Sequence, residues 1–350
     1  MKKINVAIAG VGSFTKALVE GVSFYTKNPG ERTGLMNFSI GGYHVGDINF
    51  VAAFDVDDRK VGKKLHEAVS AKPNVALTIT DPIEYSAFVH RGPTLDGVID
   101  EMRGSFVQES NAPIADIVSV LKESKADILI NLVPSGGDKA THAYAEAALQ
   151  AGCSFINCIP TPLATVPEWK SRFESKGLVL LGDDIKSQLG ATMLNRFLLA
   201  LLKMRGIKAT KSDQENRGGN ADHFNLLYRS ASKEKSKSTA LASFLEGSDV
   251  KPAVKFFYTG NPSGAKQVNI EIEGKIFGCV PIKINSVIED QISINGAGVL
   301  VDAIRAAKYL VDNGMQKDAE KVCPFLMKTV SRPVSDAEAF EMFQKVVNEI

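Results

Sequence analysis

The sequence has few of the residues that mark several large classes of protein. Its 350 residues include only four cysteines, whose spacing fits no zinc pattern and which we expect to be reduced core thiols: Cys153, Cys158, Cys279 and Cys323. The five histidines show no metal-ligand spacing. An excess of charge is also lacking, since 41 Lys and Arg residues stand against 40 Asp and Glu residues. This balance gives no indication of a nucleic acid or an acidic membrane surface as a partner.

Long apolar runs are absent as well. No stretch of about 20 apolar residues occurs, and the apolar run near the N-terminus is too short for a signal peptide. We therefore expect a cytoplasmic protein. The chain is long enough for two domains, or for one α/β domain with an insertion, and its 44% of hydrophobic residues is an ordinary share for a globular core.

Apolar runs alternate with helical patterns in the first part of the chain. Short apolar or β-branched runs predict strands at 4–9, 50–54, 128–133, 154–159 and 178–182. Helical patterns follow the first strand through Val22 and recur at 60–69 and 141–152. Strands that alternate with helices predict a doubly wound parallel sheet of the Rossmann-like α/β class.

The pattern changes after about residue 205. The segments VKFFYTG, KQVNIEIEG and CVPIKINSVIED alternate apolar and polar residues, which is typical of half-exposed antiparallel strands. From Asn295 the helical period returns. We therefore predict a nucleotide-binding Rossmann-like domain made of residues 1–200 and 296–350, interrupted by an α+β domain at 201–295.

The turn after the first predicted strand is a candidate cofactor site. It reads Gly10-Val11-Gly12-Ser13-Phe14-Thr15, a GxGxx pattern with Thr where dinucleotide-binding turns prefer Gly or Ala. Gly10 would allow the tight turn, Gly12 would let the backbone approach a pyrophosphate, and the next helix would present its positive end. A GxG between a strand and a helix also occurs as plain turn chemistry, so its place in the first strand–helix unit is what favours a cofactor.

An acidic residue, Asp55, ends the second predicted strand. Its carboxylate would accept hydrogen bonds from the adenosine ribose hydroxyls and repel a 2′-phosphate, which favours NAD over NADP. A Gly-rich insertion at 28–46 separates Asp55 from the glycine turn by more than the usual spacing, and a solvated strand-end residue is the alternative. The loop Pro134-Ser135-Gly136-Gly137, after another strand, is placed to cover the nicotinamide end.

The segment GDDIKSQLGAT at 182–192 is a candidate anion site. It precedes an apolar helix, and hydroxyl groups with free backbone amides at the start of a helix can bind an anion. Simple N-capping by Asp184 or Ser187 would explain the same residues.

Lysines form a second candidate group. Lys233 and Lys237 are four residues apart, so on a helix they would share one face, where an anion would relieve their repulsion. A solvated charged face is the alternative. Lys266 and Lys328 have no local motif around them.

Together these segments resemble the inositol-1-phosphate synthase family over nearly the whole chain. The matching stretches are AIAGVGSFTKALVEG, GLMNFSIGGYHVGDINFVAAFDVD, RGPTLDG, GDDIKSQLGAT, GGNADHFNLL, SKEKSKS, NGAGVLVDAIRAAK and PFLMK. The likeness is to the shorter bacterial and archaeal branch. GDDxKS combined with SKExxKS is specific to the family in a way that GxGxx is not.

The resemblance implies an NAD-dependent reaction without net redox change. NAD⁺ takes a hydride from C5 of the acyclic form of D-glucose 6-phosphate, the C6 enolate that follows attacks the C1 aldehyde, and NADH returns the hydride to C5. The product is 1D-myo-inositol 3-phosphate, also named L-myo-inositol 1-phosphate. Lysines would stabilise the transient charge on oxygen, each donor contributing about 3 kcal/mol. The resemblance also implies a homotetramer assembled through the inserted domain, and it leaves open whether a divalent metal or a monovalent cation assists.

Residue roles follow from the resemblance by motif. It implies proton transfer at C5 by Lys233 and Lys328, contacts to the phosphate and the C1 oxygen by Lys237 and Lys266, and catalytic carboxylates at Asp184, Asp222 and Asp302. The substrate phosphate would contact Lys186, Ser187, Gly190, Ala191, Thr192 and Lys237. The cofactor would contact Gly10, Val11, Gly12, Ser13, Phe14, Asp55, Pro134, Ser135, Gly136, Asp183 and Asn220.

Two departures from the family pattern bear on these roles. Thr15 in the glycine turn puts tight packing of the helix against the pyrophosphate in doubt, and Ala221 replaces a second Asn of the eukaryotic members. The sequence also leaves other functions open: a related cyclase acting on a different sugar phosphate, or a plain NAD-dependent dehydrogenase with an inserted dimerisation domain.

Overall fold

A six-stranded parallel sheet forms the first layer of the protein, in a computed structural model that describes residues 2–229 and 252–348. The strands occur in the order β3-β2-β1-β4-β5-β6. Their bounds are β1 Ile4–Ala9, β2 Ile48–Asp55, β3 Val89–Arg91, β4 Ile128–Asn131, β5 Ser154–Asn157 and β6 Leu180–Leu181. This order is that of the doubly wound dinucleotide-binding fold, so the predicted fold class is confirmed.

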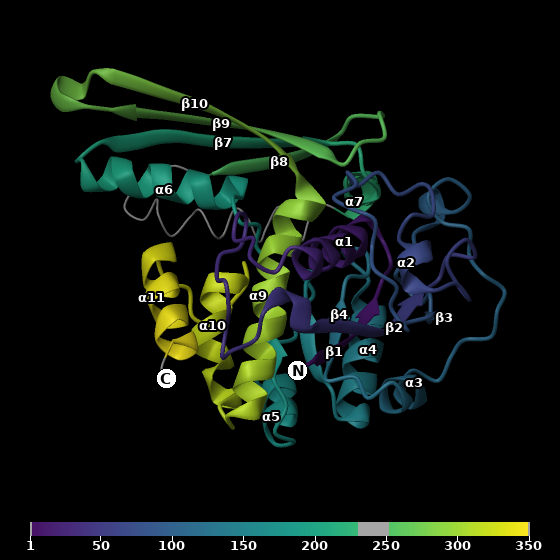
Figure 1. The fold of residues 1–350 in the computed structure, drawn as a ribbon. Coiled ribbons are helices and arrows are strands. Elements are labelled where there is room, and N and C mark those ends of the chain that lie inside the picture. Colours follow the sequence, from purple (N-terminus) through teal and green to yellow (C-terminus); the bar gives the residue numbers. More distant parts are fainter. Residues whose placement is uncertain (1, 230–251, 349–350) are drawn as a thin grey trace.

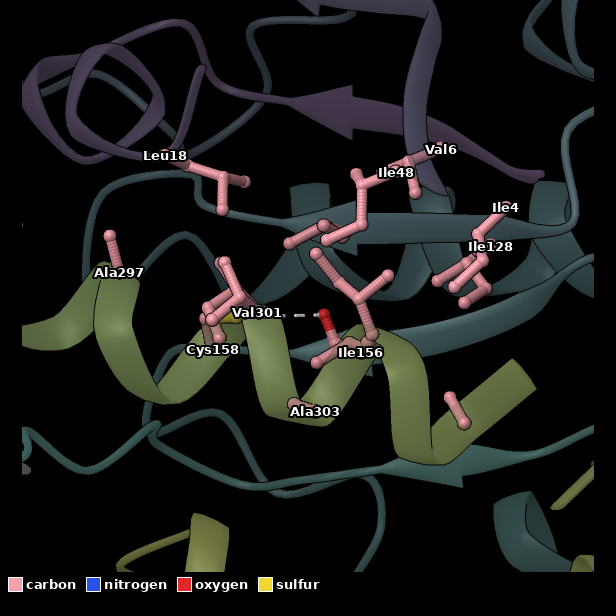
Figure 2. Close-up of a cluster of buried hydrophobic side chains, with 14 of the residues drawn as sticks. Ile4, Val6, Leu18, Ile48, Ile128, Ile156, Cys158, Ala297, Val301 and Ala303 are labelled. Atoms are coloured by element: carbon pink, nitrogen blue, oxygen red, sulfur yellow. Dashed lines mark hydrogen bonds between the residues drawn. The ribbon is translucent and has the colours of Figure 1, made fainter. Parts of the chain in front are cut away.

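Helices cover both faces of this sheet. The helices of this part are α1 Ser13–Lys27, α2 Leu65–Ala68, α3 Ile117–Glu123, α4 Asp138–Ala151, α5 Pro167–Glu174, α9 Ile292–Asp312, α10 Ala319–Leu326 and α11 Asp336–Val347. Because side chains alternate along a strand, Ile4, Val6 and Ile8 of β1 pack with α1 and α9, whereas Ala7 and Ala9 pack with α4. Figure 2 shows the first of these clusters, in which small residues of α9 let the helix lie close to the sheet.

A second, four-stranded sheet has the order β10-β9-β7-β8. Its elements are α6 Ala191–Met204, β7 Lys208–Gly218, α7 Ala221–Arg229, β8 Ala253–Tyr258, β9 Ala265–Lys275 and β10 Pro281–Gln291. Figure 1 shows this sheet as a layer above the first sheet and its helices, with α6 along its lower face. Apolar residues of α6 form a common cluster with β8 and β9, among them Leu199, Leu202, Val254 and Ile270. The proposed boundaries of the inserted domain, residues 201 and 295, stay a prediction.

The structure differs from the sequence predictions in one helix, in one strand of the second sheet and in the pairing of that sheet. The helix expected at 60–69 is reduced to Leu65–Ala68, because Gly62 adopts φ +83°, a left-handed conformation that ends regular helix. The strand β7 was not predicted, since all residues of its sequence KATKSDQENRG except one Ala and one Gly are polar. The second sheet is also not purely antiparallel, because β7 and β8 pair in parallel after the chain has passed through α7.

The cysteines are free thiols, as expected, but not all lie in the core. Cys153, Cys158 and Cys323 are buried, and burial raises the pKa of both the Cys153 and the Cys323 thiols to about 12. Cys279 is exposed in the turn between β9 and β10, so the core assignment is wrong there. None of the described helices combines the length and apolar character needed to cross a membrane.

A buried ion pair joins the Gly-rich insertion to α9. Arg305 is fully buried, pairs with Asp302 one turn earlier, and donates to the backbone carbonyls of Asn37 at 2.9 Å and Phe38 at 3.1 Å. Asp302 also accepts from the side-chain amide of Asn37 at 2.6 Å. Burial raises the pKa of the Asp302 carboxyl, and the Arg305 charge opposes that shift. These contacts tie residues 37 and 38 to α9, which explains why the insertion at 28–46 can be long without being loose.

We expect Arg305→Met to destabilise the protein by about 3–5 kcal/mol, because it leaves Asp302 buried without its counter-ion. Urea unfolding at neutral pH measures this change. Arg172→Met is the control, since Arg172 pairs with Glu146 at a site where both side chains are more than a third exposed. The control should lose no more than about 1 kcal/mol. Equal losses in the two variants would contradict the role given to the buried pair.

Candidate functional site

Two adjoining cavities lie beyond the carboxyl ends of the parallel strands. The larger has a volume of about 290 Å³ and reaches from the glycine turn to α6, α7 and β9. The smaller, about 160 Å³, follows the glycine turn to the end of β2. The residues that line both are Gly12, Ser13, Met102, Leu132, Val133, Pro134 and Ala221. One elongated site therefore runs along the switch point of the sheet, where this fold class binds its ligands.

The glycine turn has the geometry that a dinucleotide requires. Gly10 has φ +95°, and a Cβ there would lie 2.5 Å from the Leu132 carbonyl oxygen. Gly12 is the N-cap of α1, has no side-chain cap, and a Cβ on it would point into open space. Free amides at the start of α1 thus face a cradle that a side chain would fill, and such a cradle fits a pyrophosphate.

Thr15 does not disturb this turn. Its side chain is fully buried and its hydroxyl donates to the Gly10 carbonyl at 2.6 Å. This hydrogen bond closes the turn at a position where the dinucleotide pattern prefers Gly or Ala.

Asp55 braces the same turn from the second strand. One carboxylate oxygen accepts from the Val11 amide at 2.7 Å, and the other accepts from the Val56 and Asp57 amides at 2.8 and 2.9 Å. Lys60 lies 3.2 Å from Asp55, and both side chains line the smaller cavity. Asp55 is therefore neither exposed nor merely a strand end, and its orientation is fixed beside the glycine turn.

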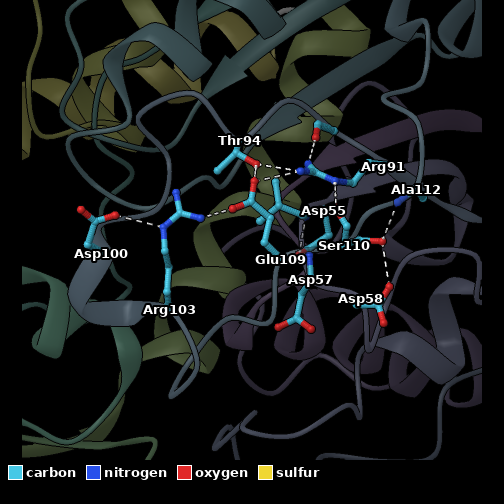
Figure 3. A network of polar contacts seen from close by, with 12 residues as sticks. Asp55, Asp57, Asp58, Arg91, Thr94, Asp100, Arg103, Glu109, Ser110 and Ala112 are labelled. Carbon is cyan, nitrogen blue, oxygen red and sulfur yellow. Dashed lines mark hydrogen bonds and ion pairs between the residues drawn. The ribbon is translucent and has the colours of Figure 1, made fainter.

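Charged residues support the outer wall of the smaller cavity. Arg91 donates to Thr94 at 2.8 Å and to Glu109 at 3.0 Å, and Arg103 pairs with the other oxygen of Glu109 (Figure 3). Thr94 lines the cavity directly. Sequence reasoning did not identify this network, because its members are spread over single positions without a motif.

The two aspartates of GDDIKS have different environments. Asp183 is fully buried and accepts from the Leu163 amide at 2.9 Å, the Ala164 amide at 3.1 Å and the Asn157 side chain at 2.8 Å. Burial raises the pKa of Asp183, and these donors oppose the shift. Asp183 lines neither cavity. It holds the loop around residue 163, so the expectation of direct cofactor contact is not supported by its position.

Asp184, by contrast, faces the larger cavity and is paired with a predicted lysine. Its carboxylate accepts from Lys328 Nζ at 2.7 Å, and its carbonyl accepts from the Lys328 amide at 2.8 Å. Asp184 has φ +63°, in the left-handed region that residues other than glycine rarely adopt. Such local strain is typical of functional sites and is maintained here by the contacts with Lys328.

The start of α6 forms the far end of the larger cavity. Its N-cap is Gly190, without a side-chain cap, so N-capping by Asp184 or Ser187 is not the role of this segment. Its predicted anion-binding residues all line the cavity: Lys186, Ser187, Gly190, Ala191 and Thr192. Uncapped amides beside hydroxyl groups and a cation are suited to a phosphate.

The second sheet supplies the opposite wall. Lys266 of β9 is buried and lines the larger cavity together with Asn220 and Asp222. Asn220 accepts from the His223 amide at 2.9 Å, which fixes the first turn of α7. The side chain of Asp222 lies 3.4 Å from the Ser135 hydroxyl, so α7 and the loop after β4 meet across the site.

The structure brings most of the predicted residues together. Asp184, Asp222, Lys266 and Lys328 line the larger cavity, as do the predicted phosphate residues of 186–192. Three predicted residues line neither cavity: Gly136 packs against Arg229, Asp183 holds the loop around residue 163, and Asp302 pairs with Arg305. Lys233 and Lys237 lie outside the described residues.

Other lining residues were missed from the sequence. Among them are Arg196, His223, Phe256 and Asp336 in the larger cavity and Lys60 in the smaller one. Arg196 could have been found, since it lies one helical turn after Thr192, whereas Asp336 follows no motif. Within residues 2–229 and 252–348, no group of three or more His, Cys, Asp or Glu side chains is arranged to hold a metal ion.

Comparisons with known proteins agree with this architecture. Residues 190–291 match the family model described as myo-inositol-1-phosphate synthase. The chain is 39% identical to the inositol-3-phosphate synthase of Corynebacterium glutamicum, covering 99% of this chain and 98% of the relative. It is 41% identical to the inositol-3-phosphate synthase of Mycolicibacterium smegmatis, covering 95% of both.

Solved structures extend the likeness to the fold. The crystal structure of Ari2 is 32% identical, with a TM-score of 0.81 over 99% of both chains. A myo-inositol-1-phosphate synthase-related protein from Thermotoga maritima shares the fold, with a TM-score of 0.78 at 23% identity. Since full-length relatives close to 40% identical carry the same family name, the chain belongs to the myo-inositol-1-phosphate synthase family.

Proposed function

We propose that the protein is an NAD-dependent inositol-3-phosphate synthase that converts D-glucose 6-phosphate to 1D-myo-inositol 3-phosphate. The observation that carries the proposal is the elongated site with two kinds of anion-binding end. One end is the glycine turn at α1, and the other is the uncapped start of α6 beside charged side chains. A dinucleotide and a phosphorylated sugar fit these ends, with the reacting carbons between them. The relatives named inositol-3-phosphate synthase support the choice of reaction.

NAD is the dinucleotide that we propose for the smaller cavity and the adjoining part of the larger one. The turn at residues 10–13 would hold its pyrophosphate, Asp55 would accept from the ribose hydroxyls, and the nicotinamide would lie near Pro134, Ser135 and Asn220. When bound, NAD⁺ supplies a hydride acceptor for C5 and, as NADH, the donor that reduces C5 again. Asp55 supports NAD over NADP because a buried carboxylate would repel a 2′-phosphate.

The lysines of the larger cavity would handle protons and transient negative charge. Lys328 is held by Asp184 at 2.7 Å, so its ammonium group has a fixed position from which to exchange a proton with the C5 oxygen. Lys233 would share this task. Lys266, buried on β9, would stabilise the C1 oxygen together with Lys237, in a cavity whose apolar lining includes Phe14, Leu226 and Phe256. Fixed donors in a site that excludes water stabilise an oxyanion more strongly than water does.

We also propose the homotetramer that the family resemblance implies. Apolar side chains are exposed on the second sheet and on α6, including Phe277 at 99%, Met204 at 81% and Val287 at 62%. Exposed apolar residues on one layer of a protein are typical of a subunit interface. These residues support assembly through the inserted domain, away from the cofactor end.

Incubation with D-glucose 6-phosphate and NAD⁺ should yield inositol monophosphate, identified by NMR of the product. No stoichiometric reduced nicotinamide should accumulate, because the oxidation at C5 is reversed within the same site. A plain dehydrogenase would accumulate one reduced nicotinamide for each substrate oxidised. If inositol phosphate is not formed but the sugar phosphate binds, the proposed reaction is wrong.

Lys266→Met should lower kcat by about 100- to 1,000-fold, because a buried oxyanion donor is lost. The affinity for NAD⁺ should change little, since the proposed pyrophosphate and ribose contacts at residues 10–13 and Asp55 do not involve Lys266. Lys275→Met is the matched control: it lies on the same strand, at the exposed end of β9, and should keep full activity. A Lys266→Met enzyme with kcat near that of the control would contradict the assignment of Lys266.

Asp55→Asn should weaken NAD⁺ binding by about 10- to 100-fold, the size expected for loss of a hydrogen bond to a charged group. It should also reduce the preference for NAD⁺ over NADP⁺, because the repulsion of the 2′-phosphate is removed. Calorimetric titration with each dinucleotide measures both effects. Asp58→Asn changes an exposed carboxylate nearby and should leave both affinities unaltered. An unchanged preference in Asp55→Asn would exclude Asp55 as the discriminating residue.

A further inference from the structure

The phosphate end of the larger cavity contains two charged residues, Arg196 and Asp336, that lie outside the family motifs. Lys186 and Arg196 both line it, and the carboxylate of Asp336 lies between them. Asp336 Oδ1 accepts from Lys186 Nζ at 3.0 Å, and Asp336 Oδ2 lies 3.2 Å from Arg196 Nε. The three residues come from the loop after β6, from α6 and from α11, so they are brought together only by the fold.

We propose that Arg196 is a further phosphate-binding residue of this site, and that Asp336 is the positioning residue that holds Lys186 and Arg196 at the same end of the cavity. The inference rests on the proposed function only for the identity of the sugar. It requires a phosphorylated ligand with its phosphate at the start of α6.

The position of Arg196 supports this role. Arg196 lies one helical turn after Thr192, and side chains four residues apart share one face of a helix. Its Nη2 donates to the Val334 carbonyl at 3.0 Å, and its side chain is only 12% exposed. A guanidinium fixed in this way beside uncapped backbone amides is preorganised for the planar, two-point contact that Arg makes with phosphate.

Asp336 also favours the protonated form of Lys186. Lys186 is nearly buried, which lowers the pKa of its ammonium group, and the positive charges of Arg196 and Lys328 lower it further. The carboxylate of Asp336 acts in the opposite direction. Lys186 also donates to the Pro324 carbonyl at 2.7 Å, so the ammonium is held from two sides. Lys186, Arg196 and Asp336 together carry a net positive charge, which favours the binding of a dianionic phosphate.

The first test measures phosphate binding directly and does not need turnover. D-glucitol 6-phosphate, which has no aldehyde and cannot cyclise, is titrated calorimetrically into the NAD⁺-loaded protein. R196Q should raise its Kd by about 10- to 100-fold, the range expected for losing a hydrogen bond between charged partners. R172Q, which changes a surface arginine on α5, should keep the wild-type Kd and NAD⁺ affinity.

A milder variant tests whether a loss of binding in R196Q comes from misfolding. R196K keeps the positive charge beside Asp336 but cannot make the two-point contact, so it should fall between wild type and R196Q. Wild-type Kd in both R196Q and R196K would overturn the role of Arg196. If the contrast in Kd holds but D-glucose 6-phosphate gives no inositol phosphate, the proposed reaction fails and this inference stands.

The second test distinguishes a positioning role of Asp336 from simple competition of its carboxylate with the phosphate. D336N removes the charge that holds the proton on Lys186, so Lys186 should lose its proton at a lower pH than in the wild type. Binding of D-glucitol 6-phosphate, which is strong while Lys186 is protonated, should therefore weaken from a lower pH upward in D336N. If D336N instead binds more tightly over the whole pH range, Asp336 only competes with the phosphate, and the positioning role is wrong.

Discussion

The site depends on a short antiparallel pairing between two distant parts of the chain. The amide of Asp183 donates to the Thr329 carbonyl at 2.9 Å, the Thr329 amide donates back at 3.0 Å, and the amide of Lys186 donates to Leu326 at 2.9 Å. This pairing fixes the loop after β6 against the segment that follows α10. It sets the direction of Lys328, stabilises the left-handed Asp184, and leads the chain into α6. The same connection thus positions both Lys328 and the start of α6.

The second constraint is the balance of charge in a partly enclosed cavity. Among the described residues, Lys186, Arg196, Lys266 and Lys328 line the larger cavity together with the carboxylates Asp184, Asp222 and Asp336. Bringing several cations out of water without counter-ions would cost several kcal/mol for each. Carboxylates placed next to particular cations reduce this cost while the site is empty, and they also fix where each cation points. The remaining positive charge is then available to a phosphate and to transient oxyanions.

Sequence alone predicts the elements whose patterns are local. Five strands of the first sheet, the glycine turn and the start of α6 follow from apolar runs and from glycines at strand ends, whereas the short edge strand β3 was not predicted. The polar strand β7 could not be predicted, because its hydrogen bonds to β8 and β9, rather than its own residues, make it a strand. Asp183 and Asp184 are adjacent and chemically identical, yet one is an internal anchor and the other faces the cavity. Only the backbone conformation between the two residues determines which side chain faces the cavity.

Asp302 and Asp336 differ in the same way, because their neighbours in space are not those that the sequence indicates. Asp302 belongs to a motif of the family, but it pairs with Arg305 and Asn37, so its charge is used to hold the Gly-rich insertion. Asp336 belongs to no motif, but α11 packs on α10 and so reaches the cations at the start of α6. A carboxylate that lies between two cations inside a ligand cavity affects binding, whatever its sequence context. The electrostatic environment of a residue in the fold is therefore better support for a functional role than its place in a motif.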